Sequence, residues 1–521
     1  MVYRGVSSGI RPSAISDKQR TVIVFSEVQA PGAYVIELTG IGQSYPFEIK
    51  ESLLRPLAVA AVKAFYYQRA STPIEEKYAG KWNRPAGHPD TNVMVHSNAA
   101  SPNRPAGTVI SSPKGWYDAG DYNKYIVNSA YSIGLMLALA EDAPEYIKTL
   151  RVNIPESDNE TPDLLNEIYY NLDWMLTMQD PEDGGVYHKL TTPNFEDFIK
   201  PTDCHQQRYV VYKSVTAALD FAASMAQAAR VYAPYEKDYP GFPEKAIKAA
   251  GKAYDWAVKH PDAFYQQEKL NGQYKPEVKT GTYGDGFAGD EFFWASIELF
   301  ATTGESSYLT TAMKHKPQQF RIPTWGSLAG LGYFTLLRKN SEFSKNAQNE
   351  QTYEELKQQL LDYCNNAITD ADNTPFVAPY GNKVRDFHWG CISESCSNQA
   401  IVLLTAYRLT GEHKYLVNAL RNADYMLGRN ATGYCYVTGF GSKSPMNPHH
   451  RLSASDDIVE PIPGLLVGGP NPGRQDKSEY PSSVPDEAYV DATPAYAANE
   501  IAINWNASLV YLSAMLGELV N

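Results

Sequence analysis

The pattern of hydrophobic and polar positions divides the chain into a short first part and a long second part. In the first part, apolar and polar residues alternate over 21–25, 34–38 and 45–49, and turns with glycine or proline separate these stretches. A period of two is typical of β-strands with one buried face. We therefore predict a β-module of about three strands over residues 1–50. An immunoglobulin-type sandwich takes roughly 100 residues, so this module is either reduced or truncated.

From Leu53 onward the apolar residues recur three and four positions apart, which predicts amphipathic helices. Long loops rich in glycine, proline, asparagine and aspartate, above all 69–115 and 429–498, interrupt the pattern, and loops of this length are usually functional. Repeated helix pairs with long loops predict a barrel of paired helices over 51–521, with its site in the loops. We expect about twelve helices, at 51–68, 124–141, 161–179, 212–232, 244–258, 289–302, 306–314, 325–338, 349–367, 397–409, 414–427 and 499–519.

Composition and charge narrow the classes of partner. The net charge of −13 disfavours nucleic acid and anionic membranes, which reward clustered lysine and arginine, and it fits a neutral substrate. The chain has 37 Tyr and 8 Trp; many serve the core, and a surplus of flat rings also suits a cleft that stacks on sugars. No apolar run reaches the length of about 18 residues that spans a membrane. The N-terminal segment lacks the apolar region of a signal peptide.

The five cysteines do not form a disulfide framework, because their number is odd and they are scattered over a long chain. Cys391 and Cys396 are close enough in sequence to form a local bridge, and a reduced pair fits equally well.

Two segments far apart in the sequence carry the candidate chemistry. One is Gly115-Trp116-Tyr117-Asp118-Ala119-Gly120-Asp121-Tyr122, and the other is Tyr496-Ala497-Ala498-Asn499-Glu500-Ile501-Ala502. Hydrolysis of a glycosidic bond with inversion needs one carboxylate that activates water and one carboxylic acid that protonates the leaving oxygen. The structural alternatives are an Asx-turn or helix cap for the aspartates and a first-turn helix position for Glu500.

These segments resemble the signatures of glycoside hydrolase family 9, which consists mostly of cellulases with an (α/α)6 barrel. The likeness covers roughly 50–520, and its motifs follow in order at 65–69, 118–122, 154–157 with 162–165, 174–179, 425–430, 449–451, 467–470 and 499–507. The resemblance implies a mainly α protein with an (α/α)6 catalytic domain over 51–521. It also implies that residues 1–50 are a partial immunoglobulin-like module, as in one branch of the family.

The resemblance assigns the general base to Asp121, the support of the nucleophilic water to Asp118 and the general acid to Glu500. Both aspartates are expected to be ionised, whereas an acid needs a raised pKa. Burial beside apolar neighbours would raise the pKa of Glu500, and a helix N-terminus at this position would oppose that shift.

The substrate-binding residues that we expect are His449, Arg451, Trp389, Tyr496 and Asp491. By resemblance, His449 and Arg451 bind sugar hydroxyls, and Asp491 either supports the acid or binds sugar. Trp389 is a candidate stacking platform, although the family continues its Trp-Gly motif with Ser-Asn and this chain has Cys391-Ile392. The histidine pair at 449–450 has no third ligand at metal spacing, which disfavours a metal site there.

Two metals require separate consideration. Asp290 and Glu291 fall where some family members bind a structural calcium, and their alternative role is to complement a helix N-terminus. A zinc site occurs in some relatives ahead of the aspartate pair. Here residues 69–115 contain His88 and His96 but no cysteine, so we expect no zinc. The chemistry itself needs no cofactor.

The sequence therefore predicts an inverting endo-β-1,4-glucanase, or cellulase, that acts on a β-1,4-glucan polysaccharide or oligosaccharide. Two alternatives stay open: an exo-acting enzyme of the same family, and a non-catalytic glycan-binding protein on the same scaffold. The substrate class predicts a secreted or periplasmic location. Neither nucleic acid nor a membrane is an expected partner.

Overall fold

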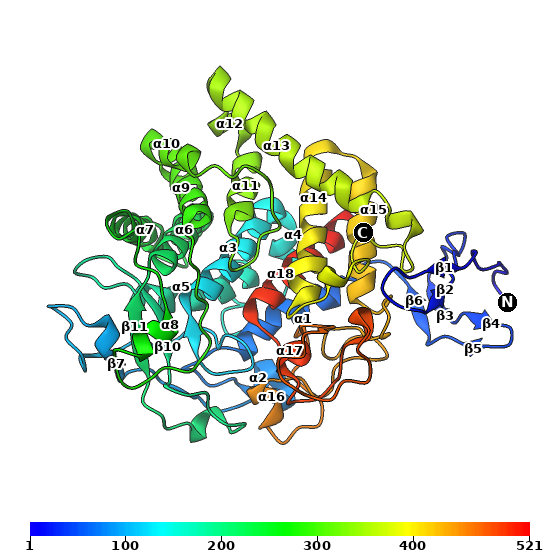
Figure 1. Cartoon of the computed structure of the whole chain (residues 1–521), viewed down its shortest axis with the longest axis horizontal. Coiled ribbons are helices and arrows are strands. Elements are labelled where there is room, and N and C mark those ends of the chain that lie inside the picture. Colours follow the sequence, from blue (N-terminus) through cyan, green and yellow to red (C-terminus); the bar gives the residue numbers. More distant parts are fainter. Residues whose placement is uncertain (521) are drawn as a thin grey trace.

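The computed structural model describes residues 1–520, and its main body is a barrel of paired helices (Figure 1). The inner ring consists of α3 (Ile126–Asp142), α6 (Val215–Tyr232), α9 (Gly289–Thr303), α11 (Ala329–Arg338), α14 (Asn398–Thr410) and α18 (Ile503–Leu519). The outer helices are α1 (Arg55–Tyr67), α5 (Asp163–Thr177), α7 (Phe242–Lys259), α10 (Ser306–Lys314), α13 (Ala347–Ile368) and α15 (His413–Met426). The ring closes where α18 packs against α3.

The inner helices are more completely buried than the outer helix α7. The inner helices α3, α6 and α18 are buried along almost their whole length, and apolar residues dominate their sequences without being confined to one face. The outer helix α7 buries one face, through Ala246, Ala249, Ala250 and Ala253. The alanine-rich sequence of α6 lets it pack closely on α7, as its small side chains predict.

The loops that lead into the inner helices meet at one end of the barrel. The loop before α9 reaches the loop before α3, since the Tyr283 hydroxyl donates to Asp118. The loop before α11 joins them through the ring of Trp325, whose centroid lies 5.0 Å from that of Tyr283. The segment before α18 pairs with the aspartate turn through an Ala119–Ala502 bridge. Residues far apart in sequence therefore converge on one site.

A five-stranded sheet, which the sequence did not predict, lies beside this end. Its order is β8 (Val109–Ile110), β7 (Val93–Val95), β11 (Tyr209–Lys213), β10 (Tyr187–Thr191) and β9 (Lys124–Tyr125). The expected helix start at 212 is wrong because residues 209–213 pair with β10 and β7. Strand β9 comes directly after the aspartate turn and pairs with β10, so the sheet holds that turn in place.

The first 50 residues form short antiparallel pairs, β1 (Arg11–Pro12) with β2 (Gln19–Arg20), β3 (Gly32–Tyr34) with β6 (Phe47–Ile49), and β4 (Glu37–Leu38) with β5 (Gly42–Gln43). The predicted strand at 21–25 is wrong. Within this segment, Val22 forms two hydrogen bonds with Ser8, one from its amide to the Ser8 hydroxyl and one from the Ser8 amide to its carbonyl. The module touches the barrel where the Arg20 guanidinium lies 4.8 Å from the Phe376 ring. Its immunoglobulin-like character stays a prediction.

The last helix begins at Ile503, not near 499 as predicted. Residues 500–502 are drawn into bridges with His449, Val467 and Ala119, so the chain there is extended. Glu500 consequently stands outside the helix. The opposing effect of a helix N-terminus on its pKa, expected from the sequence, rested on the wrong helix start.

The described residues also settle the cysteine question. All five cysteines in residues 1–520 are free thiols. The Sγ atoms of Cys391 and Cys396 point to different backbone carbonyls, those of Pro470 and Asn422, so the two thiols form no local bridge.

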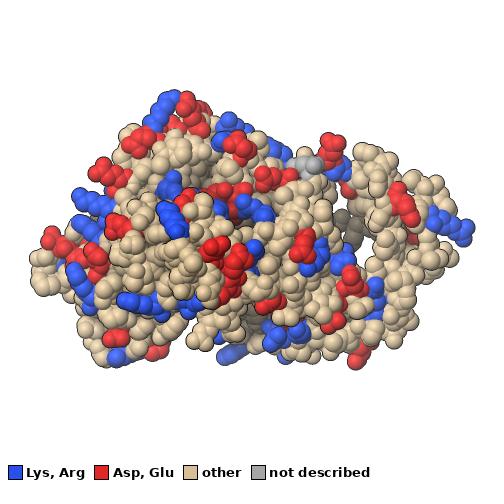
Figure 2. Space-filling model, turned by 90° about the horizontal axis from the view of Figure 1, so that it is seen from above, with Lys and Arg blue, Asp and Glu red and all other residues tan. Residues whose placement is uncertain are grey.

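Figure 2 shows basic and acidic side chains interspersed over one face of the molecule. Among the helices within residues 1–520, none combines the length and the apolar character needed to cross a bilayer.

Candidate active site

The aspartate turn holds two carboxyl groups that differ in whether one or both of their oxygens accept side-chain hydrogen bonds. Asp118 accepts a hydrogen bond on each oxygen, from Asn128 Nδ2 at 2.8 Å and from the Tyr283 hydroxyl at 2.6 Å. Asp121 receives its side-chain donors on Oδ2, from Asn123 Nδ2 at 2.6 Å and the Tyr125 hydroxyl at 3.1 Å. Within the described residues, Oδ1 of Asp121 is therefore the oxygen left to accept a proton.

The alternative role of these aspartates as helix caps is wrong. Helix α3 begins after Tyr125, and its first turn has no side-chain cap. Asp121 does accept a long backbone hydrogen bond from Asn123, at 3.3 Å, which is the contact of an Asx-turn. The turn thus uses one oxygen for local structure and keeps the other available.

Backbone pairing brings Glu500 to the aspartates. The Ala119–Ala502 bridge ties the turn to the segment that carries Glu500, and Glu500 itself is bridged to His449. Its carbonyl accepts a hydrogen bond of 3.0 Å from the amide of Gly468. Glu500 is half-buried, as expected of an acid that must reach a substrate.

The electrostatic setting distinguishes Glu500 from an ordinary surface glutamate. Burial raises the pKa of Glu500 well above its usual value, and the negative charges of Asp121 and Asp118 raise it further. Arg451 and the amide of Gly120 oppose this shift without reversing it. A raised pKa favours the protonated form of the carboxyl group, which is the form that a general acid needs.

Asp118 departs from the expectation that both aspartates are ionised. Burial, followed by the charge of Asp121, raises the pKa of Asp118 to about 8, while the donors Tyr283 and Asn128 oppose the shift. Burial and the neighbouring charge of Asp121 therefore make Asp118 harder to ionise than an ordinary aspartate. Two buried carboxylates that face one another disfavour a double negative charge.

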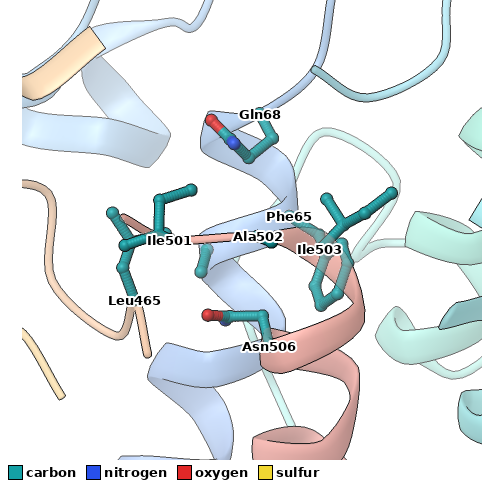
Figure 3. Close-up of a pocket in the computed structure, with 8 residues that line it drawn as sticks. Phe65, Gln68, Leu465, Ile501, Ala502, Ile503 and Asn506 are labelled. Atoms are coloured by element: carbon teal, nitrogen blue, oxygen red, sulfur yellow. The ribbon is translucent and has the colours of Figure 1, made fainter. Parts of the chain in front are cut away.

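The segment behind Glu500 is apolar, as the sequence predicted. Ile501, Ile503 and Trp505 are buried, at 1%, 2% and 5% exposure. Figure 3 shows Ile501 and Ile503 next to α1, around a small pocket that Phe65 also lines. This packing removes water from one side of the acid and accounts for the leading cause of its raised pKa.

His449, Tyr496 and Trp389 form a continuous aromatic row beside the acid. The ring centroids lie 5.7 Å apart for His449 and Tyr496, and 5.3 Å apart for Tyr496 and Trp389. Trp389 is 39% exposed, so its face is open to a ligand. His449 makes a 2.7 Å contact from Nδ1 to the carbonyl of Thr493, and burial lowers its pKa to about 4. The neutral ring donates through Nδ1 and leaves Nε2 as an acceptor for a sugar hydroxyl.

Arg451 and Asp491 act on the backbone around the site. Arg451 donates from Nη1 to the carbonyl of Gly120 at 2.8 Å and from Nε to the carbonyl of Glu196 at 2.8 Å. Asp491 accepts hydrogen bonds from the amides of Met446 and Asn447, each at 2.8 Å. Asp491 also accepts a 3.0 Å hydrogen bond from Asn499, the residue before Glu500. For Asp491, these contacts favour support of the acid over sugar binding.

The sequence did not reveal Asn128 and Tyr283, the two donors to Asp118. Asn128 lies in the first turn of α3, where the helical pattern concealed its role. Tyr283 has a positive φ of 42° between Gly281 and Gly284, a backbone conformation that a tyrosine rarely adopts. A lone tyrosine among glycines was the one signal available, and it carries no chemistry by itself.

An acidic cluster at the start of α9 includes both predicted calcium ligands. Glu291 Oε2 and both carboxyl oxygens of Asp220 are buried without a hydrogen-bond partner in the described residues. Burial and the charges of their acidic neighbours, including Asp290, raise the pKa of Asp220 and Glu291 well above the usual range. Orphaned carboxyl oxygens of this kind fit a hard cation.

The rest of the calcium geometry is incomplete. Asp290 already accepts a 2.7 Å hydrogen bond from the amide of Leu328. Nowhere in residues 1–520 do three His, Cys, Asp or Glu side chains converge as a ready ligand set. Calcium at Asp290 and Glu291 stays a prediction. His88 and His96, considered for zinc, contact the Tyr117 hydroxyl and the Pro276 carbonyl, each at 2.8 Å.

Comparison with known proteins places this geometry in a family. Residues 56–513 match the family described as glycosyl hydrolase family 9. The xyloglucan-specific endo-β-1,4-glucanase of Bacteroides ovatus is 59% identical over 518 residues, which cover 99% of this chain and 88% of that protein. Endoglucanase D of Acetivibrio thermocellus is 33% identical over 524 residues, covering 99% and 77%.

Solved structures agree with the sequence relatives. A structure described as Bacteroides ovatus GH9 has a TM-score of 0.94 at 57% identity and covers 98% of this chain and 91% of its own. A single mutant of a thermostable endoglucanase from Alicyclobacillus acidocaldarius has a TM-score of 0.87 at 30% identity, covering 99% and 93%. These neighbours are (α/α)6 barrels, so the predicted fold is confirmed.

Proposed function

This chain belongs to glycosyl hydrolase family 9, and from that premise we propose that it is an inverting endo-β-1,4-glucanase. The observation that carries the proposal is the pairing of a protonated acid with an aspartate that has a spare oxygen. Glu500 has a pKa well above the usual range, and the side-chain donors to Asp121 bind Oδ2. Single-displacement hydrolysis requires an acid and a base with these properties.

In the proposed reaction, Asp121 takes a proton from water through Oδ1 while the water oxygen attacks the anomeric carbon. Glu500 gives its proton to the glycosidic oxygen as the carbon–oxygen bond breaks, so the products carry the elements of one water molecule. Asp118, held by Asn128 and Tyr283, orients the water beside Asp121. These steps call for no cofactor.

The aromatic row supports a β-glucan as substrate. Sugar rings in a β-1,4-glucan present apolar faces, and the exposed face of Trp389 next to Tyr496 suits stacking on them. The relative at 59% identity is named for xyloglucan, so we propose a β-1,4-glucan backbone with xylose branches as the first substrate to test. A substrate of this size remains outside the cytoplasm, which is why we propose a secreted or periplasmic location.

Membership of the family identifies the chain as a glycoside hydrolase, which disfavours the non-catalytic alternative. The exo-acting alternative depends on whether loops close one end of the cleft. The long loops 69–115 and 261–287 contact each other, since His96 Nε2 lies 2.8 Å from the carbonyl of Pro276.

The test follows viscosity and reducing ends together on xyloglucan and on a soluble cellulose derivative. Endo action predicts a steep fall in viscosity with few new reducing ends. Many reducing ends with little loss of viscosity would favour the exo alternative. Absence of both signals on both polymers would contradict the proposed substrate class.

A further inference from the structure

The segment that leads into inner helix α14 is a π-helix, Ile392–Ser397, at the end of the barrel where the active site lies. Single π-helical turns are rare and are frequently found at functional sites. Most of this turn is buried: Ile392, Ser393 and Cys396 are at most 1% exposed. Glu394 is the acidic residue of the turn and is partly exposed. The turn therefore presents one carboxyl group toward an accessible space.

Glu394 connects to the catalytic aspartates through two asparagines. Asn504 donates from Nδ2 to Glu394 Oε1 at 3.5 Å, which is a long hydrogen bond. The amide oxygen of Asn504 lies 3.4 Å from Asn128 Nδ2, and Asn128 donates to Asp118. Glu394 is thus separated from Asp118 by two side chains, on the same side of the barrel.

The same turn is joined to the stacking platform. Trp389 lies five positions before Glu394, and Gly390, the residue after Trp389, faces the ring of Trp505. A side chain at Gly390 would approach that ring to 2.7 Å, so the loop and Trp505 are in close contact. Trp505 also stabilises the charged form of Glu394 through a hydrogen bond. Glu394 therefore lies within the wall that carries Trp389.

No lysine or arginine in residues 1–520 forms an ion pair with Glu394, which distinguishes it from the buried glutamates of the barrel. Glu167 pairs with Arg69 and Glu298 pairs with Arg230. A largely enclosed carboxyl group that has only uncharged donors, Asn504 at 3.5 Å and Trp505, is costly unless another partner binds it. In a sugar-cleaving cleft, the available partner is a hydroxyl group of the substrate.

We propose that Glu394 is a sugar-binding residue of the cleft that hydrogen-bonds a substrate hydroxyl, with Asn504 holding its carboxyl group in position. This inference rests on the proposed function, because it takes a β-glucan as the ligand. Burial raises the pKa of Glu394 to about 7, against the opposing donor Trp505. Near neutral pH the group can therefore accept a hydrogen bond from a hydroxyl or donate one to it.

The test measures oligosaccharide affinity by calorimetry in an inactive Glu500→Gln background. The probes are cellotetraose and its xylosylated form. Glu394→Gln keeps the shape and an acceptor for Asn504, Glu394→Ala removes both, and Glu350→Gln on the outer face of α13 is the matched control. We expect about tenfold or greater loss of affinity for Glu394→Ala, because its hydrogen bond to the sugar is removed, and a smaller loss for Glu394→Gln, which keeps an uncharged hydrogen bond. The Glu350 variant should bind as the background protein does.

A series of monodeoxy cellotetraoses separates sugar contact from a structural effect. The cost of Glu394→Gln should vanish on the one analogue that lacks the bound hydroxyl and persist on the others. Equal cost on every analogue, or unchanged affinity in variants with unchanged melting temperature, would overturn the inference. Failure of the background protein to bind any of the probes would instead count against the proposed function.

Discussion

Gly120 lies directly against the backbone of His449, and a β-carbon at Gly120 would overlap the His449 carbonyl oxygen. The contact joins the two parts of the site, because Gly120 sits between the aspartates and His449 is bridged to Glu500. The carbonyl oxygen of Gly120 also accepts hydrogen bonds from the side chain and the backbone amide of Arg451. Only a glycine lets the aspartate turn and the backbone of His449 approach this closely.

Gly120→Ala should separate the aspartate turn from the Glu500 segment. A displacement near 1 Å at a reacting group costs roughly a hundredfold in rate, so we expect a loss of kcat of at least this order. Gly251→Ala is the matched control, because nothing lies within 4 Å of a β-carbon there. The control should retain activity and, as a helical glycine, gain up to about 1 kcal/mol of stability. Equal activity of both variants would show that the close approach has no catalytic role.

Glu500→Gln should lose most activity on substrates whose leaving group needs a proton in order to depart. On a natural glucan we expect a fall in kcat of about 10²–10⁴-fold, the usual contribution of a general acid. On an aryl cellobioside with a strongly acidic phenol, which leaves without protonation, most of the rate should remain. Glu350→Gln should leave both rates unchanged. The same fractional loss on both substrates would argue against Glu500 as the acid.

The pH dependence follows from the raised pKa of Glu500. The acid works in its protonated form, so kcat/KM should fall as the pH rises through the pKa of Glu500, which burial and both aspartates raise. This alkaline limb should be absent in Glu500→Gln assayed on the activated substrate. A limb that stays in place in that variant would belong to another group.

The same shift affects stability, with a definite sign. The folded protein binds the Glu500 proton more tightly than the unfolded chain does, so this contribution is full at pH values below the unfolded pKa of about 4.3 and is lost as the pH rises through the folded pKa. In Glu500→Gln the side chain does not titrate, so this loss of stability with rising pH is absent. Its melting temperature should therefore exceed the wild-type value increasingly from weakly acidic to neutral pH and match it in acid. Thermal unfolding across this range checks the sign.

We propose that the acidic cluster at α9 takes up calcium, and the orphaned oxygens of Asp220 and Glu291 make this testable. Calcium at a hundredfold excess over its dissociation constant should stabilise the protein by about 2.7 kcal/mol, and EDTA should reverse the effect. Glu291→Gln should abolish the response. If the cluster instead holds protons, the melting temperature should ignore both additions, and Asp220→Asn should stabilise the protein at neutral pH.

The helices of the barrel were predictable because each buries a repeating apolar face or is buried throughout. Helix α6, for instance, follows from its alanine-rich sequence and was placed to within a few residues. The sheet was not predictable, since β7 and β11 pair across a long sequence separation. The sequence predicts a loop at β7 and the start of a helix at the end of β11. The predicted strand at 21–25 failed because no neighbouring strand pairs with it.

The carboxyl groups of the site could be named from the sequence, but their environment could not. The start of α18 was misplaced because the bridges to Ala119 and His449 are tertiary contacts. Nothing local indicates that Tyr283 reaches Asp118. The raised pKa of Asp118 likewise depends on burial, which a sequence motif does not report.

The stereochemistry of the fresh product tests the central claim most directly. Proton NMR recorded during the first minutes of cellooligosaccharide or xyloglucan-oligosaccharide hydrolysis identifies the anomer before mutarotation. Direct attack by a water activated by Asp121, with Glu500 as the acid, predicts that the α-anomer appears first. A β-anomer at the start would mean a covalent glycosyl-enzyme route and would contradict the assignment of these residues.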